Sequence, residues 1–269
     1  MKKDLFDVEN LVVVITGISG QLGFEYGKEF LLRGAKVVGL DISLSNYSRV
    51  LYDDFKSNFL FIESDVTNKQ SLINARLKVN SIFGSTDVLV NNAAIDSPPS
   101  SPLAENGPFE DYPIESWDRV LDVNLKGVFL ACQVFGPDMV RKNGGSIINI
   151  ASIYGIVSPD QSLYNYRRER GEIFYKPVAY SASKSGVINL TRYLAVYWAK
   201  NNIRVNSLTI AGVFNNQDIE FLNVYCERIP MGRMANSSEY NGTVIFLASK
   251  ASVYMTGHNI VVDGGWTSI

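Results

Sequence analysis

Hydrophobic and polar positions along the chain follow two alternating patterns. Longer stretches with the amphipathic spacing of helices cover residues 22–33, 45–56, 69–83, 116–142, 178–200 and 238–249. Short runs rich in β-branched residues, typical of buried strands, cover residues 11–16, 36–41, 59–63, 87–91, 146–151, 204–208 and 259–263. Strands that alternate with helices imply right-handed crossovers and a parallel sheet covered by helices on both faces. The pattern therefore predicts an α/β fold, with a doubly wound seven-stranded parallel sheet in one domain over residues 1–269.

Three segments, 96–112, 155–177 and 212–234, interrupt this alternation. Each follows a predicted strand, and the carboxyl ends of strands form the edge where open α/β sheets bind ligands. Long loops at that edge are either substrate walls or simple linkers. We expect walls, with 155–177 as an inserted loop and 212–234 as a lid over the substrate.

Composition narrows the class of protein. Of 269 residues, 46% are hydrophobic and 19% charged, with a net charge of −2, so nothing indicates a nucleic-acid or membrane surface. The start of the chain lacks the apolar segment of a signal peptide. The two cysteines, Cys132 and Cys226, lack metal-ligand spacing, and the one histidine, His258, cannot build a multi-histidine site. These features predict a cytoplasmic protein that binds no metal, no nucleic acid and no membrane.

Tyr180 and Lys184 carry the most informative chemistry. They stand four positions apart at the start of a predicted helix, so they share one helical face. A nearby cation favours phenolate, and it should lower the tyrosine pKa from about 10 toward the working pH. Such a tyrosine could exchange a proton with an alcohol or a carbonyl. Alone, the pair is weak evidence, because this spacing is more often a solvated lysine beside a half-buried tyrosine.

A glycine-rich turn, T-G-I-S-G-Q-L-G at 16–23, follows the first strand and opens the first helix. Glycines let a pyrophosphate approach the backbone, and the helix N-terminus supplies N–H groups and partial positive charge. Asp41 ends the second strand, where an acid accepts hydrogen bonds from adenosine ribose hydroxyls and repels a 2′-phosphate. Together they favour NAD over NADP. The alternatives are an ordinary βα turn and, for Asp41, a helix N-cap.

The ordered set of motifs resembles the short-chain dehydrogenase/reductase family over nearly the whole chain. The set comprises Thr16-Gly17…Gly23, Asp65-Val66, Asn91-Asn92-Ala93, Asn124, Ser152, Tyr180…Lys184 and Asp263-Gly264-Gly265. The resemblance implies a Rossmann-type fold, a nicotinamide cofactor, and hydride transfer that interconverts a secondary alcohol and a ketone.

The resemblance also implies residue roles. Tyr180 would be the acid/base, Lys184 would lower its pKa and hold the nicotinamide ribose, and Ser152 would hydrogen-bond the substrate oxygen. Asn124 would fix a water that links Lys184 to solvent, or it would be a buried amide that pins a helix. Asp65 would accept from the adenine amino group. The implied cofactor-binding residues are Thr16, Gly17, Ser19, Gln21, Leu22, Gly23, Asp41, Ile42, Asp65, Val66, Asn91, Ala93, Tyr180, Lys184, Gly212 and Val213.

Two departures from the family pattern stand out. Gln21 replaces the middle glycine of the turn, so its amide would face the cofactor or solvent. The gap from Ser152 to Tyr180 is roughly twice the usual one, and the excess carries Arg167, Arg168 and Arg170. These arginines could grip an anionic substrate such as a sugar phosphate, or they could belong to a solvated or subunit-facing loop with acidic counter-charges.

The substrate expected from the resemblance is a sugar, a sugar phosphate or a polyol. The chain looks similar to gluconate 5-dehydrogenases and to bacterial members that modify flagellin or surface sugars. The alternatives are a sugar-nucleotide epimerase or dehydratase that reuses bound NAD, and a non-catalytic NAD-binding module. Pairing of the two longest predicted helices across subunits would give a homo-oligomer, a tetramer or a dimer.

Overall fold

The computed structural model describes residues 4–96 and 103–269. Residues 1–3, part of the start used to judge a signal segment, and residues 97–102 of the first long loop lie outside the described residues. All seven predicted strands form one parallel sheet in the order β3-β2-β1-β4-β5-β6-β7. Their bounds are β1 Val12–Thr16, β2 Lys36–Asp41, β3 Phe59–Glu63, β4 Val88–Asn91, β5 Gly145–Ser152, β6 Ile203–Ile210 and β7 Asn259–Val262. The prediction of a doubly wound seven-stranded sheet is confirmed.

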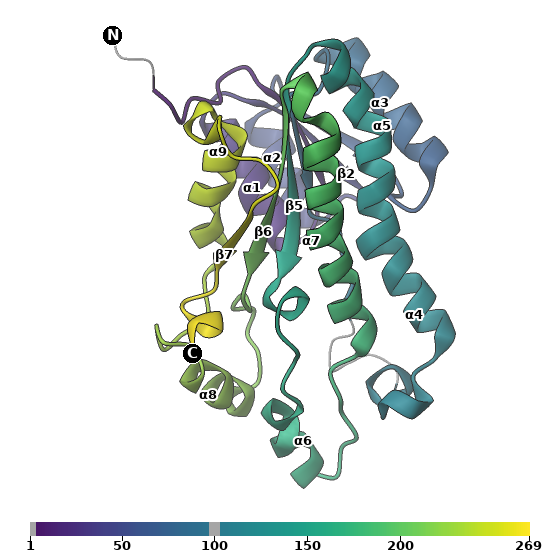
Figure 1. Ribbon diagram of the computed structural model, residues 1–269, viewed down its shortest axis with the longest axis vertical. Helices are drawn as coiled ribbons and strands as arrows, with labels where there is room; N and C mark the ends of the chain where they lie inside the picture. The colour runs from purple at the N-terminus through teal and green to yellow at the C-terminus, as the bar shows by residue number, and fades with distance from the viewer. Residues whose placement is uncertain (1–3, 97–102) are drawn as a thin grey trace.

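Helices cover both faces of the sheet (Figure 1). Side chains alternate along β1, so Val12 and Val14 pack toward one layer of helices, and Val13 and Ile15 pack toward the other. The first layer is α3 Lys69–Ile82, α5 Gly127–Arg141 and α7 Val178–Trp198, and the second is α1 Gln21–Leu32, α2 Asn46–Asp54 and α9 Asn241–Ala248. Burial on both faces explains why the strands read as continuous apolar runs in the sequence.

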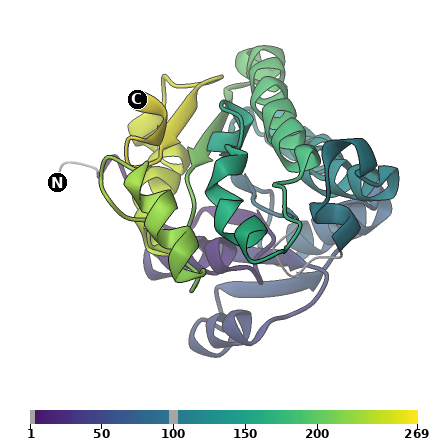
Figure 2. The ribbon, with the colours of Figure 1, turned by 90° about the horizontal axis from the view of Figure 1, so that it is seen from below.

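Three predicted segments differ in the structure. The single helix expected over 116–142 is α4 Ile114–Leu121, a π-helical turn Asp122–Lys126, and α5. The two long segments expected as loops contain short helices, α6 Asn165–Glu169 and α8 Ile219–Glu227. Both short helices lie beyond the carboxyl ends of the strands, at the bottom of Figure 1 and nearest the viewer in Figure 2. The inserted segment, residues 155–177, and the lid segment, residues 212–234, therefore meet beyond the carboxyl ends of the strands.

Among the described residues, no helix combines the length and the apolar character needed to cross a membrane.

Candidate active site

A groove of about 580 Å³ opens at the carboxyl ends of β1 and β4, where the strand order reverses. Most of the residues predicted to bind the cofactor line it. They are Gly17, Ser19, Gln21, Leu22, Asp41, Ile42, Asp65, Val66, Ala93 and Val213. The groove is also lined by Leu40, Ser64, Ile95 and Val123, for which the sequence had indicated no cofactor role.

Close backbone packing shapes the glycine-rich turn. Gly17 has φ +70°, and a Cβ atom there would come within 2.7 Å of the Ala93 Cα atom. A Cβ atom on Gly23 would lie 2.1 Å from the Gly17 carbonyl oxygen. Gly23 does not line the groove; its missing side chain lets α1 pack directly against the turn. The turn is therefore a cradle of bare backbone, which fits the pyrophosphate of a dinucleotide.

Asp41 faces this groove from the end of β2. One carboxylate oxygen accepts a hydrogen bond from the Ser19 backbone N–H at 2.9 Å, and the other accepts from the Ile42 N–H at 2.8 Å. These bonds fix the carboxylate at the groove wall, where it can also accept from ribose hydroxyls. Asp65, farther along the same groove, accepts from the Thr67 backbone and hydroxyl, each at 2.8 Å.

Two predicted cofactor residues point elsewhere. The Asn91 side chain is buried behind the groove, where its amide donates to Asn149 at 2.8 Å and to the Cys132 sulfur at 3.3 Å. The Thr16 hydroxyl oxygen accepts from the backbone N–H groups of Asn92 and Ala93, each at 3.0 Å. These two side chains brace the strand ends rather than form the groove wall, because strand alternation turns them inward.

Gln21 makes a contact that neither of its expected orientations included. Its side-chain amide donates to the Phe214 carbonyl oxygen at 2.9 Å. This bond joins the glycine-rich turn to the lid segment, 193 positions away in the chain. Gln21, which replaces a glycine of the family pattern, thus links the groove to the lid segment.

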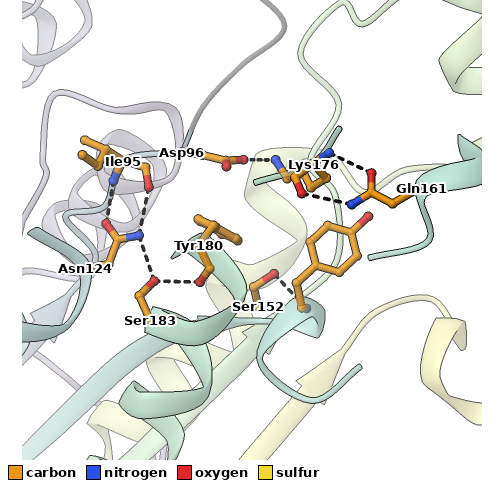
Figure 3. Close-up of polar contacts among 9 residues, drawn as sticks. Ile95, Asp96, Asn124, Ser152, Gln161, Lys176, Tyr180 and Ser183 are labelled. Carbon is orange, nitrogen blue, oxygen red and sulfur yellow. Dashed lines mark hydrogen bonds and ion pairs between the residues drawn. The ribbon is translucent and has the colours of Figure 1, made fainter. Parts of the chain in front are cut away.

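Ser152, Tyr180 and Asn124, three of the four predicted catalytic residues, lie close together in Figure 3, near Ile95, which lines this groove. Ser152 is the last residue of β5, and its hydroxyl oxygen accepts from the Tyr154 N–H at 3.2 Å. Tyr180 and Lys184 lie in the first turns of α7, with the Lys184 ammonium nitrogen 5.7 Å from the centre of the Tyr180 ring. That ammonium is buried and donates to the Ile150 carbonyl oxygen at 2.8 Å.

The electrostatics of this cluster differ from the sequence prediction. Burial, followed by the charge of Asp96, raises the pKa of Tyr180, while a hydrogen bond with Ser152 lowers it and the neighbouring Tyr225 raises it slightly. Burial lowers the pKa of Lys184 to about 8, against an opposing contribution from Asp96. The expectation of a lowered Tyr180 pKa was therefore wrong. Loss of hydration of the phenolate outweighs the ammonium, which is itself partly desolvated.

Asn124 lies in the π-helical turn and is fully buried. Its amide donates to the Ile95 carbonyl oxygen at 2.9 Å and to the Ser183 hydroxyl at 3.2 Å, and its oxygen accepts from the Ile95 N–H at 2.8 Å. Asn124 thus fastens the loop after β4 to α7. This is the arrangement of the buried amide that pins a helix, one of its two expected roles.

A second cavity of about 490 Å³ lies between the inserted segment and the lid segment. Aromatic side chains from both segments close it: Tyr164 and Phe174 have ring centres 4.5 Å apart, and Tyr164 stacks on Phe221 at 5.7 Å. Gly212 and Val213 line this cavity, and Val213 also lines the groove, so the two spaces adjoin. The adjoining groove and cavity have the form of a cofactor site beside a substrate site.

The arginines of the inserted segment already have partners. Arg167 pairs with Glu172 at 2.7 Å and with Asp218 at 3.5 Å, and Arg170 pairs with Glu220. Arg168 donates to the carbonyl oxygens of Gln161 and Phe174, at 2.8 and 3.0 Å. Of the three arginines, only Arg167 lines the cavity. The acidic counter-charges come largely from the lid segment.

Comparison with known proteins agrees with this geometry. The family model described as enoyl-(acyl carrier protein) reductase matches residues 17–267. The chain is 30% identical to an NAD-dependent glycerol dehydrogenase of Listeria innocua, over 97% of this chain and 96% of that protein. It is 35% identical to a short-chain dehydrogenase of Leptospira borgpetersenii solved with bound NAD+, with a TM-score of 0.86 over 99% and 97% of the two chains. A gluconate 5-dehydrogenase of Burkholderia cenocepacia, solved with NADP and tartrate, is 26% identical, with a TM-score of 0.85 over 99% and 98%.

Proposed function

The chain belongs to the short-chain dehydrogenase/reductase family and is an oxidoreductase that interconverts an alcohol and a ketone, and from this premise we propose that it uses NAD and acts on an uncharged sugar or polyol. The observation that carries the proposal is that Lys184 and Ser152 lie beside Tyr180, while the other neighbour of the Tyr180 ring, Lys176, belongs to the wall of the aromatic cavity. The intact cluster disfavours the non-catalytic module, and the relatives named dehydrogenases disfavour the epimerase or dehydratase.

Tyr180 exchanges the proton in this proposal. In oxidation its phenolate takes the proton of the substrate hydroxyl, and in reduction its hydroxyl returns that proton to the carbonyl oxygen. Ser152, whose interaction with Tyr180 lowers the pKa of the tyrosine, holds the same substrate oxygen and stabilises charge that develops on it. The bound nicotinamide supplies the hydride chemistry.

Lys184 acts on the cofactor through its remaining donors. One of its three N–H groups bonds Ile150, which leaves donors for ribose hydroxyls. Asn124 keeps α7 and the loop after β4 in register, so that these groups stay aligned.

Asp41 supports NAD as the cofactor. The carboxylate is held at the groove wall beside Ile42 and Ser43, and among the described residues the groove wall contains no arginine or lysine to receive a 2′-phosphate. A 2′-phosphate there would face a carboxylate at close range, which is unfavourable for charge reasons alone.

The cavity wall supports an uncharged, hydroxylated substrate. Its two cations, Lys176 and Arg167, are each paired with a carboxylate, Asp96 and Asp218 respectively. An anionic substrate would have to displace these carboxylates, whereas hydroxyl groups can hydrogen-bond to the existing pairs, and aromatic rings suit the C–H faces of a sugar or polyol. The relative named as a glycerol dehydrogenase agrees with an uncharged, polyhydroxylated substrate.

An exposed apolar stripe supports assembly into a dimer or tetramer. Tyr193, Val196 and Tyr197 on α7 are 65%, 82% and 65% exposed, and the two tyrosine rings stack 6.1 Å apart. Phe129 on the neighbouring α5 is also exposed. Such a patch is typical of a subunit interface. The two free cysteines, Cys132 and Cys226, support a reducing compartment such as the cytoplasm.

An absorbance screen tests the proposal. The wild-type protein, NAD+ and a panel of sugars, polyols and their phosphates should give NADH formation with uncharged members of the panel. Tyr180→Phe should abolish turnover and keep NADH binding, measured by fluorescence titration, while Tyr254→Phe, at a fully exposed position, should leave both unchanged. Substantial turnover by Tyr180→Phe would refute the assignment of the acid/base.

A further inference from the structure

Lys176 brings a second ammonium group to the catalytic tyrosine. Its Nζ lies 5.4 Å from the centre of the Tyr180 ring, and the side chain is only 11% exposed. The comparable distance for Lys184 is 5.7 Å. Lys184 comes from the same helix as the tyrosine, whereas Lys176 comes from the inserted segment, so it is a feature of this chain's insertion.

The inserted segment holds Lys176 firmly in place. The Gln161 side chain accepts from the Lys176 backbone N–H at 2.8 Å and donates to the Lys176 carbonyl at 3.0 Å (Figure 3). The Arg168 guanidinium in turn holds the Gln161 backbone carbonyl at 2.8 Å. Arg168, which was a candidate to bind an anionic substrate, instead fixes the position of Gln161, and Gln161 fixes the position of Lys176.

Asp96, in the loop after β4, is the ion-pair partner of Lys176 in the cavity wall. Its carboxylate forms an ion pair with Lys176, and both residues line the 490 Å³ cavity (Figure 3). Asp96 follows Ile95, whose backbone N–H and carbonyl are both hydrogen-bonded to the buried Asn124. The same fastening that aligns the catalytic helix therefore also positions Asp96.

This pair offers both kinds of hydrogen-bonding group at the place where a substrate would contact Tyr180. An ammonium group has three donors and a carboxylate has two acceptor oxygens, so a hydroxyl group can accept from Lys176 and donate to Asp96 at once. We propose that Asp96 and Lys176 form a polar subsite that binds the hydroxyl group on the carbon next to the reacting carbon. The enzyme then selects vicinal diols and α-hydroxy ketones over simple secondary alcohols. This inference rests on the proposed function and adds the residues that choose the substrate.

The test compares two alcohols that differ by one hydroxyl group, 1,2-propanediol and 2-propanol. Wild-type kcat/KM should favour the diol by at least about a hundredfold, since a site built to bind a hydroxyl rejects the analogue that lacks it. Lys176→Met and Asp96→Asn should each reduce this ratio at least tenfold, mainly through KM for the diol, and Lys176→Arg should restore part of it. Lys142→Met is the matched control, because it removes a similar ion pair, with Asp87, at the opposite edge of the sheet.

The ratio separates recognition from other effects. Any change that Lys176 causes in the proton affinity of Tyr180, or in the fold, acts on both alcohols and cancels. Equal losses for both alcohols, or a wild-type enzyme without preference, would overturn the subsite. If Lys176→Met does not fold, Lys176→Arg and Asp96→Asn decide the question by the same ratio. A wild-type protein that binds NADH but oxidises no member of the alcohol panel would instead refute the proposed function, and the subsite with it.

Discussion

Replacing Gly23 with alanine tests whether the glycine-rich turn is built by close packing of α1. The added Cβ atom would lie 2.1 Å from the Gly17 carbonyl oxygen and 2.8 Å from the Ile18 Cα atom. Ordinary contact begins at 3.4 Å, so the turn and the helix must separate by about 1.3 Å (3.4 − 2.1). Both neighbours are backbone atoms, which cannot move aside by rotating a side chain.

Two opposing contributions set the free energy of unfolding of Gly23→Ala. Overpacking of this kind costs about 1–3 kcal/mol, whereas alanine is preferred over glycine inside a helix by about 1 kcal/mol. We expect Gly23→Ala to be less stable by about 1 kcal/mol, which lowers the melting temperature by about 2–4 °C for a chain of this size. Because the displaced turn forms the phosphate cradle, NADH affinity should fall at least about tenfold, or 1.4 kcal/mol.

Thermal unfolding and NADH fluorescence titration measure the two effects. Gly242→Ala is the matched control: this glycine is also near the start of a helix, α9, and an added Cβ atom would meet nothing within 4 Å. It should be neutral or more stable by up to about 1 kcal/mol, with unchanged NADH affinity. Equal melting temperatures and equal NADH affinities for Gly23→Ala and Gly242→Ala would show that close packing at Gly23 does not shape the turn.

Three other substitutions test separate parts of the site. Asp41→Ala should narrow the preference for NAD over NADP by at least about tenfold in kcat/KM, since it removes the carboxylate that repels a 2′-phosphate; an unchanged ratio would contradict this role. Lys184→Met should abolish turnover yet stabilise the cofactor-free protein by about 1–2 kcal/mol at pH 7. Burial lowers the folded-state pKa of Lys184 to about 8, below the unfolded value of about 10.4, so the free energy of unfolding of the wild type should rise between these two pH values. The stability advantage of Lys184→Met should therefore disappear above about pH 10.4, which urea unfolding at about pH 7 and pH 10.5 measures. A stability advantage that grows with pH would contradict this prediction. Arg168→Met should loosen residues 161–176 and raise KM for charged and uncharged substrates alike, because the Arg168 guanidinium holds two backbone carbonyls there. Hydrogen exchange measures the loosening. A rise in KM confined to anionic substrates would indicate that Arg168 binds the substrate instead.

Local pattern in the sequence predicted most of the fold. Strands buried on both faces appear as apolar runs, so all seven were placed to within two residues at each end. The missed boundaries have a local cause: the π-helical turn around Asn124 keeps helical spacing, and hydrophobic periodicity does not distinguish it from α-helix. The short helix α8 packs on aromatic residues of the inserted segment, and α6 is linked to the lid segment by the ion pair of Arg167 with Asp218. No local pattern encodes such contacts.

Electrostatics were harder to predict than position. Tyr180 and Lys184 lie on one helical face as the spacing requires, but the pKa of Tyr180 depends on burial and on Asp96, 84 positions earlier. The sequence shows which charge is next along the helix and does not show how much water the fold removes. Desolvation can reverse the sign expected from a neighbouring charge.

The sequence by itself determined the order of strands and helices, the glycine-rich turn at the first helix, and the presence of a serine, a tyrosine and a lysine in family order. Only the tertiary structure decided that Asn91 turns behind the groove, that Gln21 reaches Phe214, and that Asp96 and Lys176 meet beside Tyr180. The reason is that periodicity reports which face of an element is buried, whereas contacts between distant loops depend on how those loops pack across the edge of the sheet.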